Sequence, residues 1–303
     1  MRFDALEIRS DQGRTVHAYL AAPCVCGSSM QLRYCCGKGG RLQLRSQPSP
    51  TRPALPSTGH AHGRCYARAL NDCSEQISKE HYLSRGVLRE LAAAGPTNTV
   101  RASGMGLPED DLPPDQVGQA KILCGRHNSA LSALDTAGAR LFRALREGMK
   151  TIPAFAYRSF SGVDVERWLL KVTCGVRAAS KQDVPLEWLE FLFGSAELPP
   201  MLGLYMHVRV DHRVTETLGI QFATYTRADG PSGGELVMDG VRFTLDLRGD
   251  RGTHRREDIG SLKIYRPNGI WFDHFGAATF LLGLEWGDRI AAPNSVVVEV
   301  QHG

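Results

Sequence analysis

The 303-residue sequence lacks any hydrophobic run long enough to cross a membrane. A membrane helix needs roughly eighteen consecutive apolar residues, and the candidate stretch FGAATFLLGLEWG is far shorter. The first residues, MRFDALEIRSDQGR, also lack the basic flank and apolar run of a secretory signal. These absences argue against export and against a membrane partner. We therefore expect a cytoplasmic chain whose thiols stay reduced.

Acidic residues are absent from Gln12 to Asn71, although the whole chain has a net charge of only +4. That span carries eight basic residues: Arg14, Arg33, Lys38, Arg41, Arg45, Arg52, Arg64 and Arg68. Because phosphate groups attract such a segment, the charge favours a nucleic-acid partner. Residues 41–63 are also rich in Pro, Ser, Thr and Gly. This composition offers few positions that could pack, and it predicts a flexible basic linker.

Cysteine is scarce as well, since the chain has eight, yet four of them stand close together near the start. Two chemistries compete for such a group, namely disulfides in a secreted domain and a metal site with four thiolates. The adjacent residues Cys35 and Cys36 could bond to each other only with strain. In a reducing compartment the group favours zinc, with four thiolate ligands: Cys24, Cys26, Cys35 and Cys36.

The pattern of these cysteines resembles the SEC-C motif, a small zinc module. The resemblance covers residues 23–38, which read Cys-x-Cys-Gly-Ser, a short polar run, and Tyr-Cys-Cys-Gly-Lys. Val25 stands where the family usually has proline, which leaves the four ligands in place. The resemblance implies a structural zinc in a knuckle over residues 23–40 that binds nucleic acid or a protein partner. Residues 1–22 would then be an N-terminal extension.

A second group of zinc ligands is predicted further along the chain. Seven residues separate Cys65 from Cys73, and two separate Cys124 from His127. A Cys-x2-His pair can reach one ion from the first turn of a helix, and leucines at helical spacing follow in HNSALSALDTAGARLFRALREG. We expect the four residues to enclose one zinc in a treble-clef or ββα core. The chain would then hold two structural zinc ions.

The Glu80-His81 pair, together with Asn128 beside the last zinc ligand, resembles the HNH endonuclease family. The resemblance covers about residues 64–147 and implies an HNH-like zinc domain at 64–150. Hydrolysis of a phosphodiester needs a base and a divalent cation. By resemblance, His81 is the general base, and Glu80 and Asn128 hold Mg²⁺ or another divalent cation.

The chain departs from the HNH pattern between these parts. The middle Asn of the family has no clear counterpart, although Asn98 is a candidate. The interval between His81 and Cys124 is long. It implies an inserted helix at SRGVLRELAAAG and an acidic loop at GLPEDDLPPDQ.

Residues 151–303 predict a C-terminal α+β domain, which makes the whole chain α+β. The stretches VDVERWLLKVTCGVRAA and PLEWLEFLFG have the apolar spacing of helices. Alternating segments follow from about Met201, and turn signals at Asp239-Gly240 and Asn268-Gly269 predict hairpins of an antiparallel sheet. Cys174 is expected to be a buried thiol. We expect this half to set the choice of target or partner.

Two functions are compatible with these patterns. The first is an HNH-type endonuclease that hydrolyses DNA, and the alternative is a non-catalytic zinc module that binds nucleic acid or protein. In an active site, His81 and Asn128 should face each other across an open gap with Glu80 nearby. In a scaffold they should be buried and hydrogen-bonded to the backbone.

Overall fold

The chain was described with a computed structural model, and the prediction of a mixed α+β protein is confirmed. The structure describes residues 5–9, 15–19, 21, 31–34, 48–93, 95, 97–104, 107–150, 156–209, 213–215, 219–227, 230–248, 261–274, 279–287, 289 and 295–301. The cysteines of the predicted SEC-C knuckle, Cys24, Cys26, Cys35 and Cys36, lie outside these residues. That zinc site therefore stays a prediction.

The helices lie where the apolar spacing predicts them. The described part contains α1 (Arg85–Ala92), α2 (Gly125–Met149), α3 (Gly162–Ala179) and α4 (Leu186–Leu192), with 3-10 turns at Leu32–Tyr34 and Arg68–Leu70. α1 is the inserted helix that the long interval before Cys124 implies. Within the described residues, no helix combines the length and apolarity that a membrane crossing needs.

The first large sheet is antiparallel throughout, as the alternating segments predict. Its strand order is β10 (Ile220–Arg227), β11 (Gly230–Met238), β12 (Val241–Asp246), β8 (Gly203–Arg209) and β13 (Ser261–Tyr265). Asp239 and Gly240 form the two-residue turn between β11 and β12, with φ angles of 45° and 82°. Positive φ at both positions matches the twist of a hairpin, so this turn is confirmed.

The second large sheet differs from the expectation because it is largely parallel. Its order is β7 (Ala156–Ser161), β15 (Thr279–Glu285), β14 (Gly269–Asp273), β16 (Ser295–Gln301) and β9 (Arg213–Thr215), and only β14 and β15 pair antiparallel. The predicted Asn268-Gly269 hairpin is wrong, since β13 and β14 belong to different sheets. Parallel neighbours come from distant parts of the chain, and local alternation cannot indicate them.

Three small hairpins complete the described strands. They are β1 (Ala5–Arg9) with β2 (Thr15–Tyr19), β3 (Ile77–His81) with β6 (Gln119–Cys124), and β4 (Val100–Gly104) with β5 (Leu107–Leu112). The last pair occupies part of the segment that we expected to be an acidic loop, so that expectation is wrong for 107–112. Backbone pairing with β4 forms the strand although its residues are acidic.

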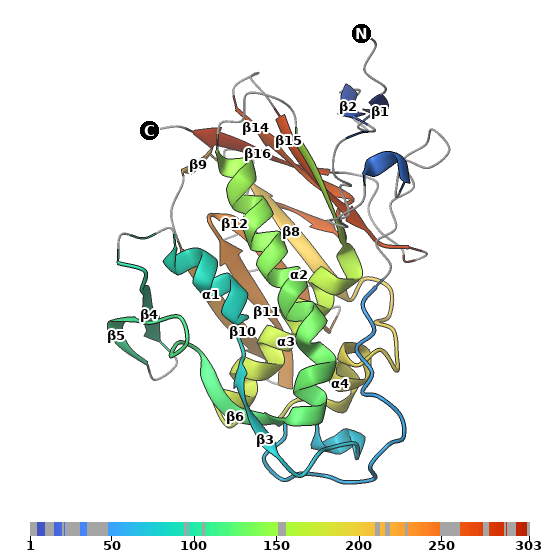
Figure 1. Cartoon of the computed structure of the whole chain (residues 1–303), viewed down its shortest axis with the longest axis vertical. Coiled ribbons are helices and arrows are strands. Elements are labelled where there is room, and N and C mark those ends of the chain that lie inside the picture. Colours follow the sequence, from blue (N-terminus) through green and yellow to red (C-terminus); the bar gives the residue numbers. More distant parts are fainter. Residues whose placement is uncertain are drawn as a thin grey trace.

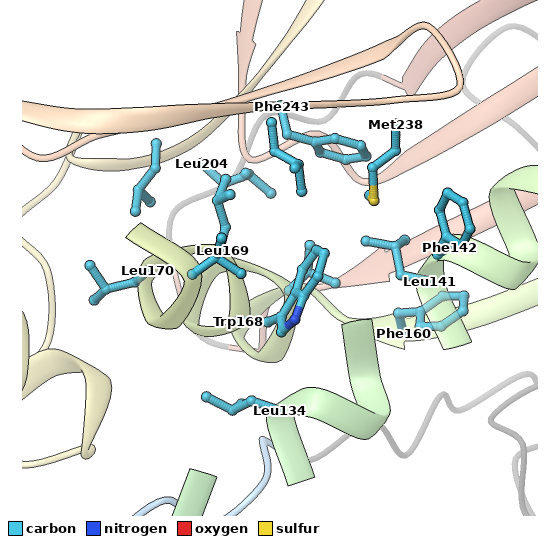
Figure 2. Packing of buried hydrophobic residues seen from close by; sticks show 14 of the residues in the cluster. Leu134, Leu141, Phe142, Phe160, Trp168, Leu169, Leu170, Leu204, Met238 and Phe243 are labelled. Carbon is cyan, nitrogen blue, oxygen red and sulfur yellow. The ribbon is translucent and has the colours of Figure 1, made fainter. Parts of the chain in front are cut away.

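The core surrounds α3, which lies between α2 and the antiparallel sheet (Figure 1). Every residue from Gly162 to Arg177 is buried. Figure 2 shows Trp168 and Leu169 between side chains of α2, such as Leu134, and strand residues, such as Phe243. One continuous hydrophobic cluster therefore includes residues from both sides of the predicted boundary at 150.

Part of the predicted flexible linker lies against this body. Ser49 donates to the Asp164 carboxylate from its backbone N at 2.8 Å and from Oγ at 2.7 Å, and Arg52 Nη2 donates to the Gly194 carbonyl at 2.9 Å. Thr51 between them is buried. Polar contacts rather than apolar packing hold this segment. The expectation of a flexible linker over 41–63 thus does not hold for its described part, 48–63.

The contact between α2 and α3 is close enough to require glycine. A Cβ atom at Gly138 would lie 2.2 Å from Cε2 of Trp168. We predict that Gly138→Ala lowers the free energy of unfolding by about 1–3 kcal/mol, because the overpacking exceeds the gain in helix propensity. Urea denaturation measures the change. Gly125→Ala is the matched control on the same helix, where the nearest atom would be 3.6 Å away. Equal stabilities of the two variants would contradict the prediction.

Candidate metal centre and adjoining pocket

The predicted zinc ligands come from one strand–strand–helix unit. β3 and β6 pair antiparallel, with Ile77 opposite Cys124 and His81 opposite Gln119. α2 begins directly after β6, so Cys124 is its N-cap residue and His127 lies in its first turn. Cys65 and Cys73 precede β3, and the backbone N–H of Tyr66 donates to the Ile122 carbonyl of β6 at 2.8 Å. This pairing holds the first two cysteines beside the other two ligands.

The four side chains meet at one point. The His127 Nδ1 atom lies 3.6 Å from Cys65 Sγ, 3.8 Å from Cys73 Sγ and 3.2 Å from Cys124 Sγ. All four potential ligand atoms lie within 4.8 Å of one another, and all four residues are buried. Sulfur and nitrogen ligands of a tetrahedral zinc lie about 3.5 Å apart, given Zn–S and Zn–N bonds of about 2.3 and 2.0 Å. The cluster could therefore hold a metal ion such as zinc, and this grouping is confirmed.

The environment of the cluster is adverse to free thiolates and suits ligands of a cation. Burial raises the pKa of Cys65 well above the ordinary value. Burial acts on Cys124 in the same way, but the backbone N–H groups of His127 and Ser74 bring the pKa of Cys124 below its ordinary value. Burial also lowers the pKa of His127 to about 4, so its ring is neutral near pH 7. A neutral imidazole can donate its Nδ1 lone pair to a metal.

Neighbouring groups fix the ligands. The backbone N–H of Cys124 donates to Cys65 Sγ, and that of Ser74 donates to Cys124 Sγ, both at 3.4 Å. Such N–H···S bonds orient thiolates around a metal. The ring of Phe193 packs 4.8 Å from the ring of His127. The buried Nε2 of His127 has no hydrogen-bond partner, so contacts at the other side of the ring hold it in place.

A pocket of about 550 Å³ adjoins this unit between β3, α1 and α2. The predicted residues Glu80, His81 and Asn128 all line it, together with Arg85, Asp135, Arg140 and Arg143. The exposed Asn98 does not line this pocket. The structure thus brings the three predicted HNH residues to one concave surface and leaves out the candidate for the middle Asn.

His81 stands at the end of β3 and is partly exposed. Its Nε2 lies 3.1 Å from the amide nitrogen of Gln119. Because an amide nitrogen only donates, Nε2 accepts this bond and the ring proton is on Nδ1. Burial lowers the pKa of His81, the positive charge of Arg85 lowers it further, and the backbone carbonyl of Asp115 opposes the shift. The ring is therefore a neutral proton acceptor near pH 7.

Glu80 points away from His81 into a buried charge network that the sequence analysis missed. It forms an ion pair with Lys171 of α3, whose side chain is 1% exposed. Lys171 Nζ also donates to Asp135 Oδ1 at 2.6 Å and to the His81 carbonyl at 3.3 Å. Burial opposes the positive charge, but Asp135 and Glu80 together raise the pKa of Lys171. The ammonium thus stays charged and anchors the end of β3 to the core.

Asp135 has two unlike oxygens. Oδ1 accepts hydrogen bonds from Ser84 Oγ at 2.5 Å and from Lys171, and Ser84 in turn accepts from Trp168 Nε1 at 2.7 Å. No side chain or N–H of the described residues donates to Oδ2, and the side chain is 31% exposed toward the pocket. A lysine inside an otherwise apolar helix was the signal in the sequence that could have indicated this network.

Comparisons of the chain with protein-family models, with curated proteins and with solved structures found no match. The SEC-C and HNH resemblances are therefore carried by the motifs alone.

Proposed function

We propose that the protein is a metal-dependent endonuclease of the HNH type that hydrolyses phosphodiester bonds of DNA. The observation that carries this proposal is the pocket in which His81 of β3 meets Asn128 of α2. The same helix carries the zinc ligand His127 directly before Asn128. A metal-stapled strand–strand–helix unit thus presents a histidine and an amide to one space, which is the arrangement that the HNH reading requires.

The charges around the pocket suit a phosphodiester substrate. At its inner wall, the carboxylates of Glu80 and Asp135 and the ammonium of Lys171 leave one net negative charge. At the rim stand arginines, of which Arg85 pairs with Asp115 and Arg143 with Glu90. A negative inner wall attracts a cation, and a basic rim attracts phosphate. Both attractions are needed for metal-assisted hydrolysis.

The roles of the residues follow from their surroundings. His81 would accept the proton of the attacking water at Nε2, where Gln119 now donates. The oxygens that face the pocket are those of Asn128 and Asp135, and oxygen ligands suit Mg²⁺ or another hard cation. Such a cation, when bound, neutralises charge that develops on the phosphate and leaving oxygen. Glu80, which we expected to be a ligand, instead pairs with Lys171, so Asp135 is the better candidate.

The buried ion pair of Glu80 favours a second candidate function, a zinc module that binds nucleic acid without cleaving it. In that case Glu80 only stabilises the fold, and the SEC-C knuckle and the basic rim provide the binding surface. The two functions differ in one property, since only the nuclease needs the lone pair of His81. A partner of either kind would be nucleic acid, and the SEC-C motif could add a protein partner.

We predict that His81→Ala lowers Mg²⁺-dependent nicking of plasmid DNA by about 100-fold or more, the usual contribution of a general base. Bound zinc should stay unchanged, because His81 is not a ligand of the cluster. Gel assays of nicking and elemental analysis of the same samples measure both quantities. His60→Ala, at an exposed position, is the matched control. Undiminished nicking by the His81 variant would overturn the role of His81. Nicking absent from the unaltered protein with every metal tested would leave the binding module.

The pH dependence of the rate tests the same residue. The neutral ring is the active form, so the rate should fall as the pH falls through the pKa of His81. Because burial places that pKa below the ordinary 6.5, the rate should be level near pH 7 and decline only in more acidic buffer. A decline that begins above pH 7 would indicate a different base.

A further inference from the structure

Three buried hydrogen-bond donors at the far side of α3 have no acceptor. They are Arg167 Nε, Arg289 Nη1 and Thr51 Oγ1. Arg167 is 8% exposed, and no described residue forms a hydrogen bond or an ion pair with its guanidinium. A buried charged donor without a partner costs several kcal/mol. Buried groups of this kind therefore indicate an additional ligand.

The three donors belong to one neighbourhood around α4. The rings and cations are in contact there, since the Phe191 ring centroid lies 5.3 Å from Cζ of Arg167 and 5.4 Å from Cζ of Arg289. Burial lowers the pKa of Arg167, and the nearby charge of Arg289 lowers it further. Two cations are thus held close together although they repel each other.

The carboxylates in this neighbourhood already have other partners. Asp164 accepts hydrogen bonds from Ser49, and Glu166 accepts two from Arg266 at 2.9 Å. Arg289 Nη1 is 3.7 Å from Glu166, beyond a normal hydrogen bond. The three arginines Arg167, Arg266 and Arg289 face the two buried carboxylates, which leaves one positive charge. Glu197, which contacts Arg289, is 77% exposed and shares its charge with solvent.

Gly194 leaves a small space beside two of these donors. A Cβ atom built on Gly194 would lie 3.2 Å from Arg167 Nη2 and 3.4 Å from Thr51 Oγ1, with no closer atom. An oxygen atom near that point would be within hydrogen-bond reach of both groups. The segment that contains Thr51 covers the space, because Arg52 donates to the Gly194 carbonyl and Ser49 to Asp164. The enclosed position suits a small ligand.

We propose that Arg167, Arg289 and Thr51 form a binding site for a small oxyanion, either free phosphate or a phosphate monoester. One oxygen of the anion lies beside Gly194 and accepts from Arg167 and Thr51, while another accepts from Arg289. The anion neutralises the excess positive charge and ties the segment around Thr51 to α3 and α4. This site is separate from the pocket at His81 and does not depend on the proposed nuclease function.

The test is the unfolding temperature of the full chain as sodium phosphate replaces sodium chloride at constant ionic strength. The unaltered protein should show a saturable rise, because phosphate binds only the folded state. In Arg167→Met the rise should disappear, and in Thr51→Val the apparent affinity should fall at least threefold. The conservative Thr51 variant decides the matter if the arginine variant does not fold. Arg143→Met, at the rim of the other pocket, should respond like the unaltered protein.

The outcomes separate the possibilities. A phosphate monoester that stabilises more than free phosphate identifies the esterified ligand as the better occupant, and equal effects identify phosphate itself. A rise that does not saturate, or one that is equal in Arg167→Met and Thr51→Val, overturns the site. A response lost only in Arg143→Met places phosphate at the rim of the other pocket and also overturns it.

Discussion

Cys124→Ser is expected to lose one zinc per chain and to unfold the unit of β3, β6 and α2. A serine hydroxyl stays protonated and cannot replace a thiolate ligand. Structural zinc contributes about 10–16 kcal/mol to the folding of small zinc domains, while whole domains are stable by only about 5–15 kcal/mol. Elemental analysis would measure the zinc, and circular dichroism during heating would measure the loss of structure.

The matched control for this prediction is Cys174→Ser. Cys174 is also a free buried cysteine, but it lies in α3 and is not part of the cluster. It should keep its zinc and lose only modest stability, since one polar group replaces a small hydrophobic one. If Cys124→Ser retained its zinc and its unfolding midpoint, the cluster would be four packed thiol and imidazole groups rather than a metal centre.

Lys171→Met should lower the free energy of unfolding by about 3–5 kcal/mol, the usual result when one partner of a buried ion pair is removed. The variant leaves Glu80 buried without a counterion and leaves Asp135 Oδ1 with one donor fewer. It also frees the His81 carbonyl from its contact with α3. Urea denaturation with linear extrapolation gives the difference.

The double variant Lys171→Met with Glu80→Gln tests the cause. If the unpaired carboxylate destabilises the single variant, neutralising Glu80 should recover part of the lost free energy. A single variant within about 0.5 kcal/mol of the unaltered protein would show that the network contributes little, as with surface substitutions. A double variant no more stable than the single one would assign the loss to packing of the lysine stem instead of charge.

The zinc cluster and the helices were accessible from the sequence because their signals are local. Cys124 and His127 share one helical turn, and the leucines after them repeat with the period of α2. The four ligands had only to be recognised by type and spacing. The pocket could also be anticipated in part, since His81 and Asn128 were chosen by their motif and both line it.

Other features depend on contacts between distant segments, which spacing does not encode. The pairing of β7 with β15 joins strands on either side of the antiparallel sheet's residues. The same holds for Lys171, whose partners Glu80 and Asp135 come from β3 and α2. Read alone, α3 looked amphipathic, because Arg167 and Lys171 suggested a face toward water. Their burial became visible only when carboxylates and aromatic rings from other elements surrounded the helix.

The enclosure of α3 on every side also governs how the chain can be divided. A fragment that ended before Gly162 would keep the metal cluster but would expose the leucines of α2 that now contact Trp168. A fragment that began there would carry Lys171 and Arg167 inside an apolar helix without the groups that compensate them. The metal unit and the two sheets therefore share a single folding cooperativity. Shuffling the HNH-like segment into another protein would have to transplant this helix with it.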